Sequence, residues 1–334
     1  MWKISAGCWE RFIMNKTEYG KEICGKRQIS RDILFGIGVM LLFLSSPLFM
    51  TYLPNMGELQ FYFCQNDGLR GPFLTIPLLL LRAGMDRLLI CQIYILIVNL
   101  FTCVCSWYAF AQITDNKYAG LAGSLFYSLS VYSMMIRYDK GLLGEMTAYA
   151  WMPLVICGIW GLILGDQKKT RLYTGISAAG LAGVLYSSVP LGIMAYIVIL
   201  LTGMVFFAKR KTGKRRLWWM AAIVLPILAA QPVLRPWMEH MGGSKAAACY
   251  AGELFLSYRI RMVIVCLCSM AVSCLGRYIH DNRRHLMGIF MISAVVVQVC
   301  GGIFYMNELL YSTEPVYEAG EEYAPEEFLL YINR

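Results

Sequence analysis

Charged residues are scarce in this chain. They make up 15% of its 334 residues, whereas hydrophobic residues make up 58%. A soluble globular domain usually carries about 25% charged residues. With a mean hydropathy of +0.55, this composition excludes an ordinary soluble fold and favours an integral membrane protein.

Residues that bind metals are also few, because the chain has only 3 histidines and no pair of CxxC motifs. Most of its 12 cysteines lie inside apolar runs, where a thiol usually serves as a small buried hydrophobic group. We therefore predict no metal site and no cofactor, although the sequence leaves a divalent cation open.

Long apolar runs dominate what the chain does contain. A helix needs about 20 apolar residues to cross a hydrocarbon core, and backbone polar groups in lipid must pair within their own segment. We predict an all-α polytopic transmembrane bundle of about nine spans, lying within residues 33–305. The predicted spans are 33–53, 88–113, 118–136, 146–164, 172–186, 189–208, 217–233, 260–276 and 286–305, with a hairpin around 187–190.

The basic residues predict the orientation. Most of the 30 Lys and Arg residues fall in the N-terminal arm (1–32) and in KKTR (168–171), KRKTGKRR (209–216) and RYIHDNRR (277–284). Basic loops stay on the cytoplasmic side. We therefore expect a multi-pass cell-membrane protein with a cytoplasmic N-terminus. Its outer segments are 54–87, 137–145, 234–259 and an acidic tail, 306–334. Basic residues divided among short loops beside anionic lipid argue against nucleic-acid binding.

The first outer loop contains CQNDGLRGPF (64–73), with Asp67 and Arg70 close to the first span. The apolar stretch from Pro72 to Gly84 is too short to cross and is interrupted by Pro77. It predicts a bent helix lying in the membrane interface. Asp67 then either caps that helix or has a chemical role at headgroup depth.

The second outer loop, RYDKGLLGE (137–145), is unusually rich in charge, with Arg137, Asp139, Lys140 and Glu145 between two apolar spans. Charges at membrane depth need partners or water. One interpretation is a self-neutralising set that holds the turn. The other is that the cations bind an anionic headgroup while an acid serves as base or orienting group.

Three stretches resemble known proteins. YSMMIRYDKGLLGEMTAYAWMPLVICGIW (132–160), with Gly144-Glu145 followed by Pro153, is similar to a block in bacterial YfhO-like membrane proteins. The same block occurs in the group named as related to 6-pyruvoyl-tetrahydropterin synthase. Gln65 to Gly68 resembles their aspartate segment after the first span, and AGEEYAPEEF (319–328) resembles the stretch that opens their external domain.

The resemblance implies a GT-C-like fold, a helical glycosyltransferase architecture that uses polyprenyl-phosphate-linked sugars at the outer membrane face. It implies Asp67 as catalytic base, and Arg137, Asp139, Lys140 and Glu145 as contacts for the lipid phosphate or the acceptor. Arg70 is a further candidate for the phosphate, since Arg binds phosphate in a bidentate fork. The chain has one Asp where the family has an acidic pair, and it ends where the external domain would begin. We therefore expect either a shortened or degenerate copy, or a partner chain that carries that domain.

The leading hypothesis is a membrane glycosyltransferase acting on an envelope glycan or lipid acceptor. No Gly-rich nucleotide loop is present, which favours a lipid-linked donor. Tyr127, Tyr132, Tyr138 and Trp151 would line a groove for its lipid tail or form the aromatic belt. A transporter or flippase and a non-catalytic scaffold are the alternatives.

Overall fold

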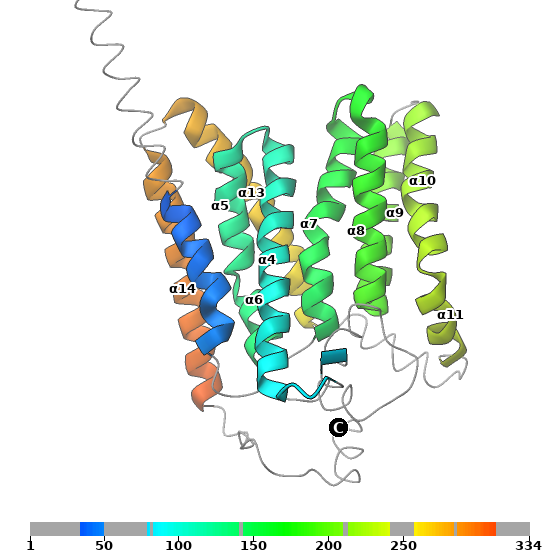
Figure 1. Ribbon diagram of the computed structural model, residues 1–334. Coiled ribbons are helices and arrows are strands. Elements are labelled where there is room, and N and C mark those ends of the chain that lie inside the picture. Colours follow the sequence, from blue (N-terminus) through cyan, green and yellow to red (C-terminus); the bar gives the residue numbers. More distant parts are fainter. Residues whose placement is uncertain are drawn as a thin grey trace, which may run out of the picture.

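The computed structural model describes residues 34–49, 79–80, 83–139, 143–209, 213–240, 257–283 and 286–311. All regular elements within these ranges are helical, so the predicted all-α class is confirmed (Figure 1). In chain order they are Leu34–Phe49, which ends in η1 (Ser46–Phe49), α4 (Arg87–Thr114), α5 (Lys117–Ser128), α6 (Val131–Met134), η3 (Met135–Asp139), α7 (Leu143–Leu164), η4 (Gln167–Lys169), α8 (Thr170–Ser187), α9 (Val189–Lys209), α10 (Gly213–Ala229), α11 (Gln231–His240), α13 (Ser257–Asn282) and α14 (Met287–Tyr311).

Among the described helices, three are long and apolar enough to cross a membrane, namely Leu88–Thr114, Leu143–Leu164 and Arg261–Asn282. The bent pair Lys117–Ser128 and Val131–Tyr138 is a fourth if it forms one span. Leu34–Phe49, Val189–Met204 and Met287–Ile303 are shorter apolar helices. These lengths and compositions fit a membrane protein, while the count of nine spans stays a prediction.

The outer surface of the bundle is apolar, as a lipid-facing surface requires. Large apolar side chains on α9, α10 and α14 are about half exposed or more, including Leu200, Leu201, Leu225, Leu228 and Val297. In water such a surface would be unfavourable, at roughly 25 cal/mol per Å² of apolar area. The exposed apolar side chains and the apolar runs of the sequence therefore both indicate that this surface faces lipid.

Short connections reverse the chain between neighbouring helices. The α4–α5, α7–α8 and α13–α14 connections lie at one end of the bundle, the top in Figure 1. The predicted hairpin around 187–190 is confirmed, because only Ser188 separates α8 from α9. Of the interfacial helix predicted for 72–84, only 79–80 and 83–84 lie within the described residues.

Small residues bring α7 and α8 close together. A Cβ atom on Gly158 of α7 would lie 2.6 Å from the backbone nitrogen of Ser177 on α8. One turn later, a Cβ on Gly161 would collide with the ring of Tyr173. Contacts of this kind between small residues are a main source of helix association in lipid, where hydrophobic driving force is absent. Pro153 lies within α7, which agrees with its place in the predicted span 146–164.

The segment 118–136, predicted as one span, is bent by 50° between Ser128 and Val131. Ser130 starts the second part, because its hydroxyl accepts a hydrogen bond from the backbone N–H of Ser133 at 3.2 Å. The segment then continues into η3, a π-helical turn over Met135–Asp139. Turns of this type occur frequently at functional sites, and this one carries Arg137.

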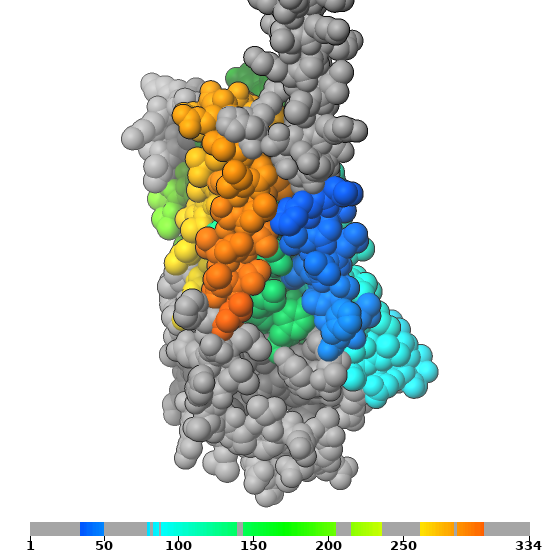
Figure 2. All heavy atoms as spheres, turned by 90° about the vertical axis from the view of Figure 1, so that its left-hand side faces the viewer, coloured from blue at the N-terminus to red at the C-terminus, as the bar shows by residue number. Residues whose placement is uncertain are grey.

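The helix Leu34–Phe49 packs on the flank of the bundle beside α14 (Figure 2). Its Gly36 faces Leu121 of α5 and Met291 of α14. Phe43 is buried, whereas Leu42 is 72% exposed. One face of this helix therefore covers the bundle and the opposite face is available to lipid.

Candidate functional site

Arg137 is completely buried, with 0% of its surface exposed. Its guanidinium group donates hydrogen bonds to the hydroxyl of Ser133, one turn earlier, and to the hydroxyl of Thr102 on α4 at 3.0 Å. The guanidinium carbon lies 5.2 Å from the centre of the Phe43 ring and 5.7 Å from that of Tyr149. Four elements, namely the Leu34–Phe49 helix, α4, α6 with η3, and α7, thus surround one cation.

Within the residues that the structure describes, the contacts of Arg137 include no carboxylate. In the part of the chain that the structure describes, the ion pairs involve Arg277 and His280 at the other end of the bundle. The Nε atom of Arg137 also has no hydrogen-bond partner there. Two hydroxyls and two aromatic faces offset part of the several kcal/mol that burying a lone charge costs. Among the described residues, one N–H of Arg137 and its positive charge are left for an anion.

Buried hydroxyl groups extend from Arg137 into the bundle. The hydroxyl column consists of Thr102, Ser106, Ser124 and Ser133, all 0% exposed. The hydroxyls of Ser106 on α4 and Ser124 on α5 lie 2.6 Å apart. The hydroxyl of Thr102 donates to the carbonyl of Val98, as helical Thr commonly does. The contact between Ser106 and Ser124 holds α4 against α5, and the bond from Arg137 to Thr102 joins η3 to α4.

A second set of polar contacts fixes the Leu34–Phe49 helix beside Arg137. The hydroxyls of Ser46 and Tyr138 lie 2.6 Å apart. The side-chain amide of Asn99 reaches the Tyr138 hydroxyl at 3.4 Å and the carbonyl of Phe43 at 3.5 Å. Tyr138 therefore links η3 to the helix that covers Arg137.

The other predicted site residues are placed only in part. Glu145 is 4% exposed in the first turn of α7, one turn before Tyr149 and on the same face of that helix. Asp139 is the last residue of η3, and its side chain is not described. Asp67, Arg70 and Lys140 lie outside the described residues. The structure thus brings Arg137 and the Glu145 face of α7 to the same end of the bundle.

The tyrosines have a role that the sequence did not reveal. Tyr127 and Tyr149 stack with ring centres 4.1 Å apart and an interplanar angle of 2°. Each hydroxyl donates to the backbone carbonyl of the other residue at 2.7 Å. Tyr127 and Tyr132 are buried in the core, so their predicted place in a lipid groove or aromatic belt is wrong. The reason is that both rings pack against Tyr149 of α7, and the Tyr127 hydroxyl donates to its carbonyl, which sequence spacing cannot show.

This pair predicts a measurable loss of stability. In a Tyr127→Phe variant, the Tyr149 carbonyl loses its donor inside the bundle, which costs roughly 1–3 kcal/mol in free energy of unfolding. Reversible unfolding in detergent would measure the change. Tyr278→Phe, at a residue that is 66% exposed, is the control. An unchanged stability in Tyr127→Phe would show that the reciprocal hydrogen bonds contribute nothing.

The chain has no detectable relative in three comparisons: no protein-family model, no curated protein and no solved structure matches it. Within the described residues, no three His, Cys, Asp or Glu side chains gather as a metal site would require. Any functional assignment therefore depends on the chemistry of the chain itself.

Proposed function

We propose that this chain is a GT-C-type membrane glycosyltransferase, which transfers a sugar from a polyprenyl-phosphate-linked donor to an envelope glycan or lipid at the outer membrane face. The single observation that supports this best is Arg137, a fully buried cation whose described contacts include hydroxyls and rings but no carboxylate. A phosphate group is the natural anion for such an arginine, because the guanidinium fork matches two phosphate oxygens.

Asp67 is the proposed base. It takes the proton of the acceptor hydroxyl while that oxygen attacks the anomeric carbon and the bond from this carbon to the phosphate oxygen breaks. The departing polyprenyl phosphate gains negative charge, which Arg137 stabilises together with Arg70 and Lys140. Glu145 and Asp139 orient these cations or the acceptor. A partner chain with an external domain would complete the acceptor site.

Access to Arg137 requires one covering element to move. The Phe43 ring covers one side of the guanidinium group, and the Leu34–Phe49 helix that carries it is largely exposed on its opposite face. The hydrogen bond between Ser46 and Tyr138 holds this helix closed. In the proposed mechanism, the helix shifts when the donor lipid enters from the side.

The experiment for this function is an Asp67→Asn variant assayed for sugar transfer from polyprenyl-phosphate donors in nanodiscs. A positioned general base contributes roughly 10²–10⁴-fold, so we expect kcat to fall by that factor while donor binding persists. Asp281→Asn, at an exposed acid at the other end of the bundle, should leave kcat unchanged. Full activity in Asp67→Asn would remove Asp67 from the role of base.

A second candidate is a flippase or transporter of a lipid-linked or envelope substrate. The hydroxyl column favours it, because buried polar groups within transmembrane helices often mark a pathway. Proteoliposomes containing a fluorescent polyprenyl-phosphate analogue would test this. A flippase would expose the inner-leaflet label to an external quencher, whereas a transferase alone would leave that label protected.

A further inference from the structure

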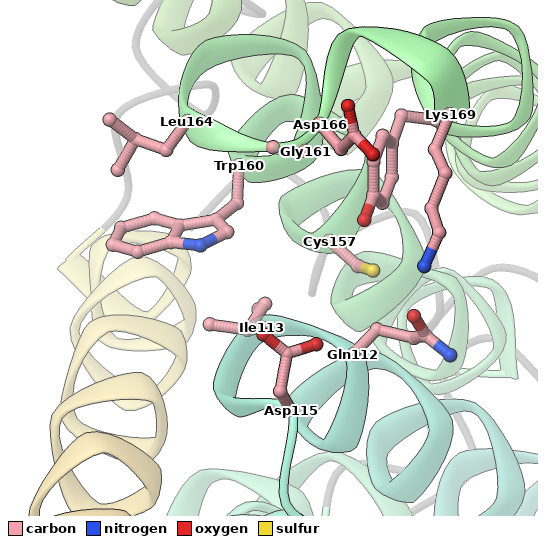
Figure 3. A pocket seen from close by; sticks show the side chains of 11 residues that line it. Gln112, Ile113, Asp115, Cys157, Trp160, Gly161, Leu164, Asp166 and Lys169 are labelled. Carbon is pink, nitrogen blue, oxygen red and sulfur yellow. The ribbon is translucent and has the colours of Figure 1, made fainter.

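A cavity of about 240 Å³ opens at the end of the bundle opposite Arg137. It lies where α4 and α7 end and α8 begins (Figure 3). Three of the residues that line it, Ile113, Cys157 and Tyr173, are buried. Its mouth is polar and includes Asp115 and Lys169. The cavity is thus a separate feature from the Arg137 site.

Two carboxylates approach the cavity from different elements. Asp115 belongs to the α4–α5 connection and Asp166 to the α7–α8 connection (Figure 3). One oxygen of Asp166 accepts a hydrogen bond from the backbone N–H of Lys168 at 3.1 Å, which leaves its second oxygen for another donor. Asp115 meets Arg277 only at 4.0 Å, and both side chains are well exposed. Among the described residues, neither acid meets a close, buried cation.

Besides the two acids, the cavity is lined by an aromatic side chain, Trp160, and by a cation, Lys169. The indole of Trp160 borders the cavity from one side and the chain of Lys169 from the other (Figure 3). An indole face attracts a cation within about 6 Å of its centre. The lysine ammonium attracts an anion. The cavity therefore offers places for a positive and a negative group of one small molecule.

The walls of the cavity are held in place by the fold. Gly161 leaves room for the Tyr173 ring, because a Cβ atom there would collide with it. Arg215 of α10 donates to the carbonyls of Ile163 and Gly165 at 2.8 and 2.9 Å, which fixes the end of α7. Asp115 adopts a left-handed conformation with φ of 50° that ends α4. The cavity is consequently formed before any ligand enters.

We propose that this cavity binds a primary ammonium linked to a phosphate, the chemistry of an ethanolamine phospholipid headgroup. The ammonium donates to Asp115 and Asp166 and lies against Trp160, while the phosphate contacts Lys169. A quaternary ammonium has no N–H group to give to the carboxylates, so a choline headgroup fits less well. An anionic headgroup without a cation fits less well too, because two carboxylates and one lysine give the cavity a net negative charge that repels it.

Two sources could supply this chemistry, namely the membrane lipid and a soluble phosphoethanolamine. If the bundle spans the membrane, the cavity lies at one of its ends and hence near headgroup level. Leu164, which lines the cavity, is 55% exposed, as expected beside acyl chains. This placement favours the lipid as the source.

Native mass spectrometry of the full chain in nanodiscs tests the proposal, with phosphatidylethanolamine, phosphatidylcholine and phosphatidylglycerol offered at equal amounts. We expect retention of the ethanolamine lipid at least tenfold above the other two. The double variant Asp115→Asn, Asp166→Asn should lose this preference, and Asp281→Asn, at an acid of the same bundle end, should keep it. Added soluble phosphoethanolamine identifies the source: competition at equal concentration indicates the soluble ligand, and no competition indicates the lipid.

Trp160→Leu provides a second variant, because it changes the aromatic wall without removing an acid. We expect at least a threefold lower preference for the ethanolamine lipid. Equal retention of all three lipids by the wild-type chain, or an unchanged preference in the double variant, would overturn the proposal. Thermal unfolding of each variant in the same nanodiscs confirms that a lost preference reflects the cavity and not the fold.

Discussion

An Arg137→Met variant is expected to bind polyprenyl phosphate about 100-fold more weakly than the wild-type chain, which corresponds to ~2.7 kcal/mol. Each hydrogen bond to a charged group is worth roughly 1.5–3 kcal/mol, and the substitution removes the charge and all its donors. Binding of uncharged polyprenol should not change. Native mass spectrometry in nanodiscs with both lipids measures the two affinities side by side.

The variant should still fold. Met fills much of the space of the arginine, and since no described carboxylate pairs with Arg137, the substitution leaves no buried countercharge behind among the described residues. The hydroxyls of Thr102 and Ser133 keep their bonds to the carbonyls of Val98 and Ser128. Arg137→Lys is the matched control: it keeps the charge but loses the fork, so we expect an intermediate affinity. If Arg137→Met kept its phosphate binding and only lost stability, Arg137 would be a structural residue.

A Gly158→Leu substitution should separate α7 from α8. The added side chain would enter the backbone of Ser177, whose nitrogen is 2.6 Å from the Cβ position, and a backbone segment in a packed helix cannot move aside locally. Overpacking of this kind costs roughly 1–3 kcal/mol and occasionally more. We expect the upper end of that range, measured as the free energy of unfolding in detergent.

Gly175 of α8 offers the control for this experiment, because no atom lies within 4 Å of its Cβ position. Gly175→Leu makes the same chemical change on the partner helix, and it should leave the stability unchanged or raise it slightly through higher helix propensity. Equal behaviour of the two variants would contradict the close approach of α7 and α8.

Much of the architecture could be predicted from the sequence, because each of the nine predicted spans overlaps a described helix. Apolar runs and helix-ending turns are local signals. The bend between Ser128 and Val131 was missed because no proline or glycine marks it, and the hydroxyl of Ser130 starts the second part instead. The break between α10 and α11, at residue 230, falls within a predicted span and was missed although Pro226 and Pro232 lie on either side of it.

The candidate site could be predicted only in part. Arg137 and Glu145 attracted attention because charged residues are rare beside apolar spans. Thr102 was not predicted, because the sequence around a threonine in an apolar helix does not show which residue its hydroxyl contacts. Its contact with Arg137 joins residues 35 positions apart, and only the packing of α4 against η3 creates it. The cavity near Trp160 escaped for the same reason, as its lining comes from three helices and two connections.

The most direct measurement is a cryo-EM structure of the wild-type chain in a nanodisc with a bound polyprenyl-phosphate sugar. The account predicts density for the phosphate against the Arg137 guanidinium, with the Phe43 ring displaced from it. A donor bound elsewhere, with Arg137 still enclosed by Phe43, Thr102 and Ser133, would contradict the account.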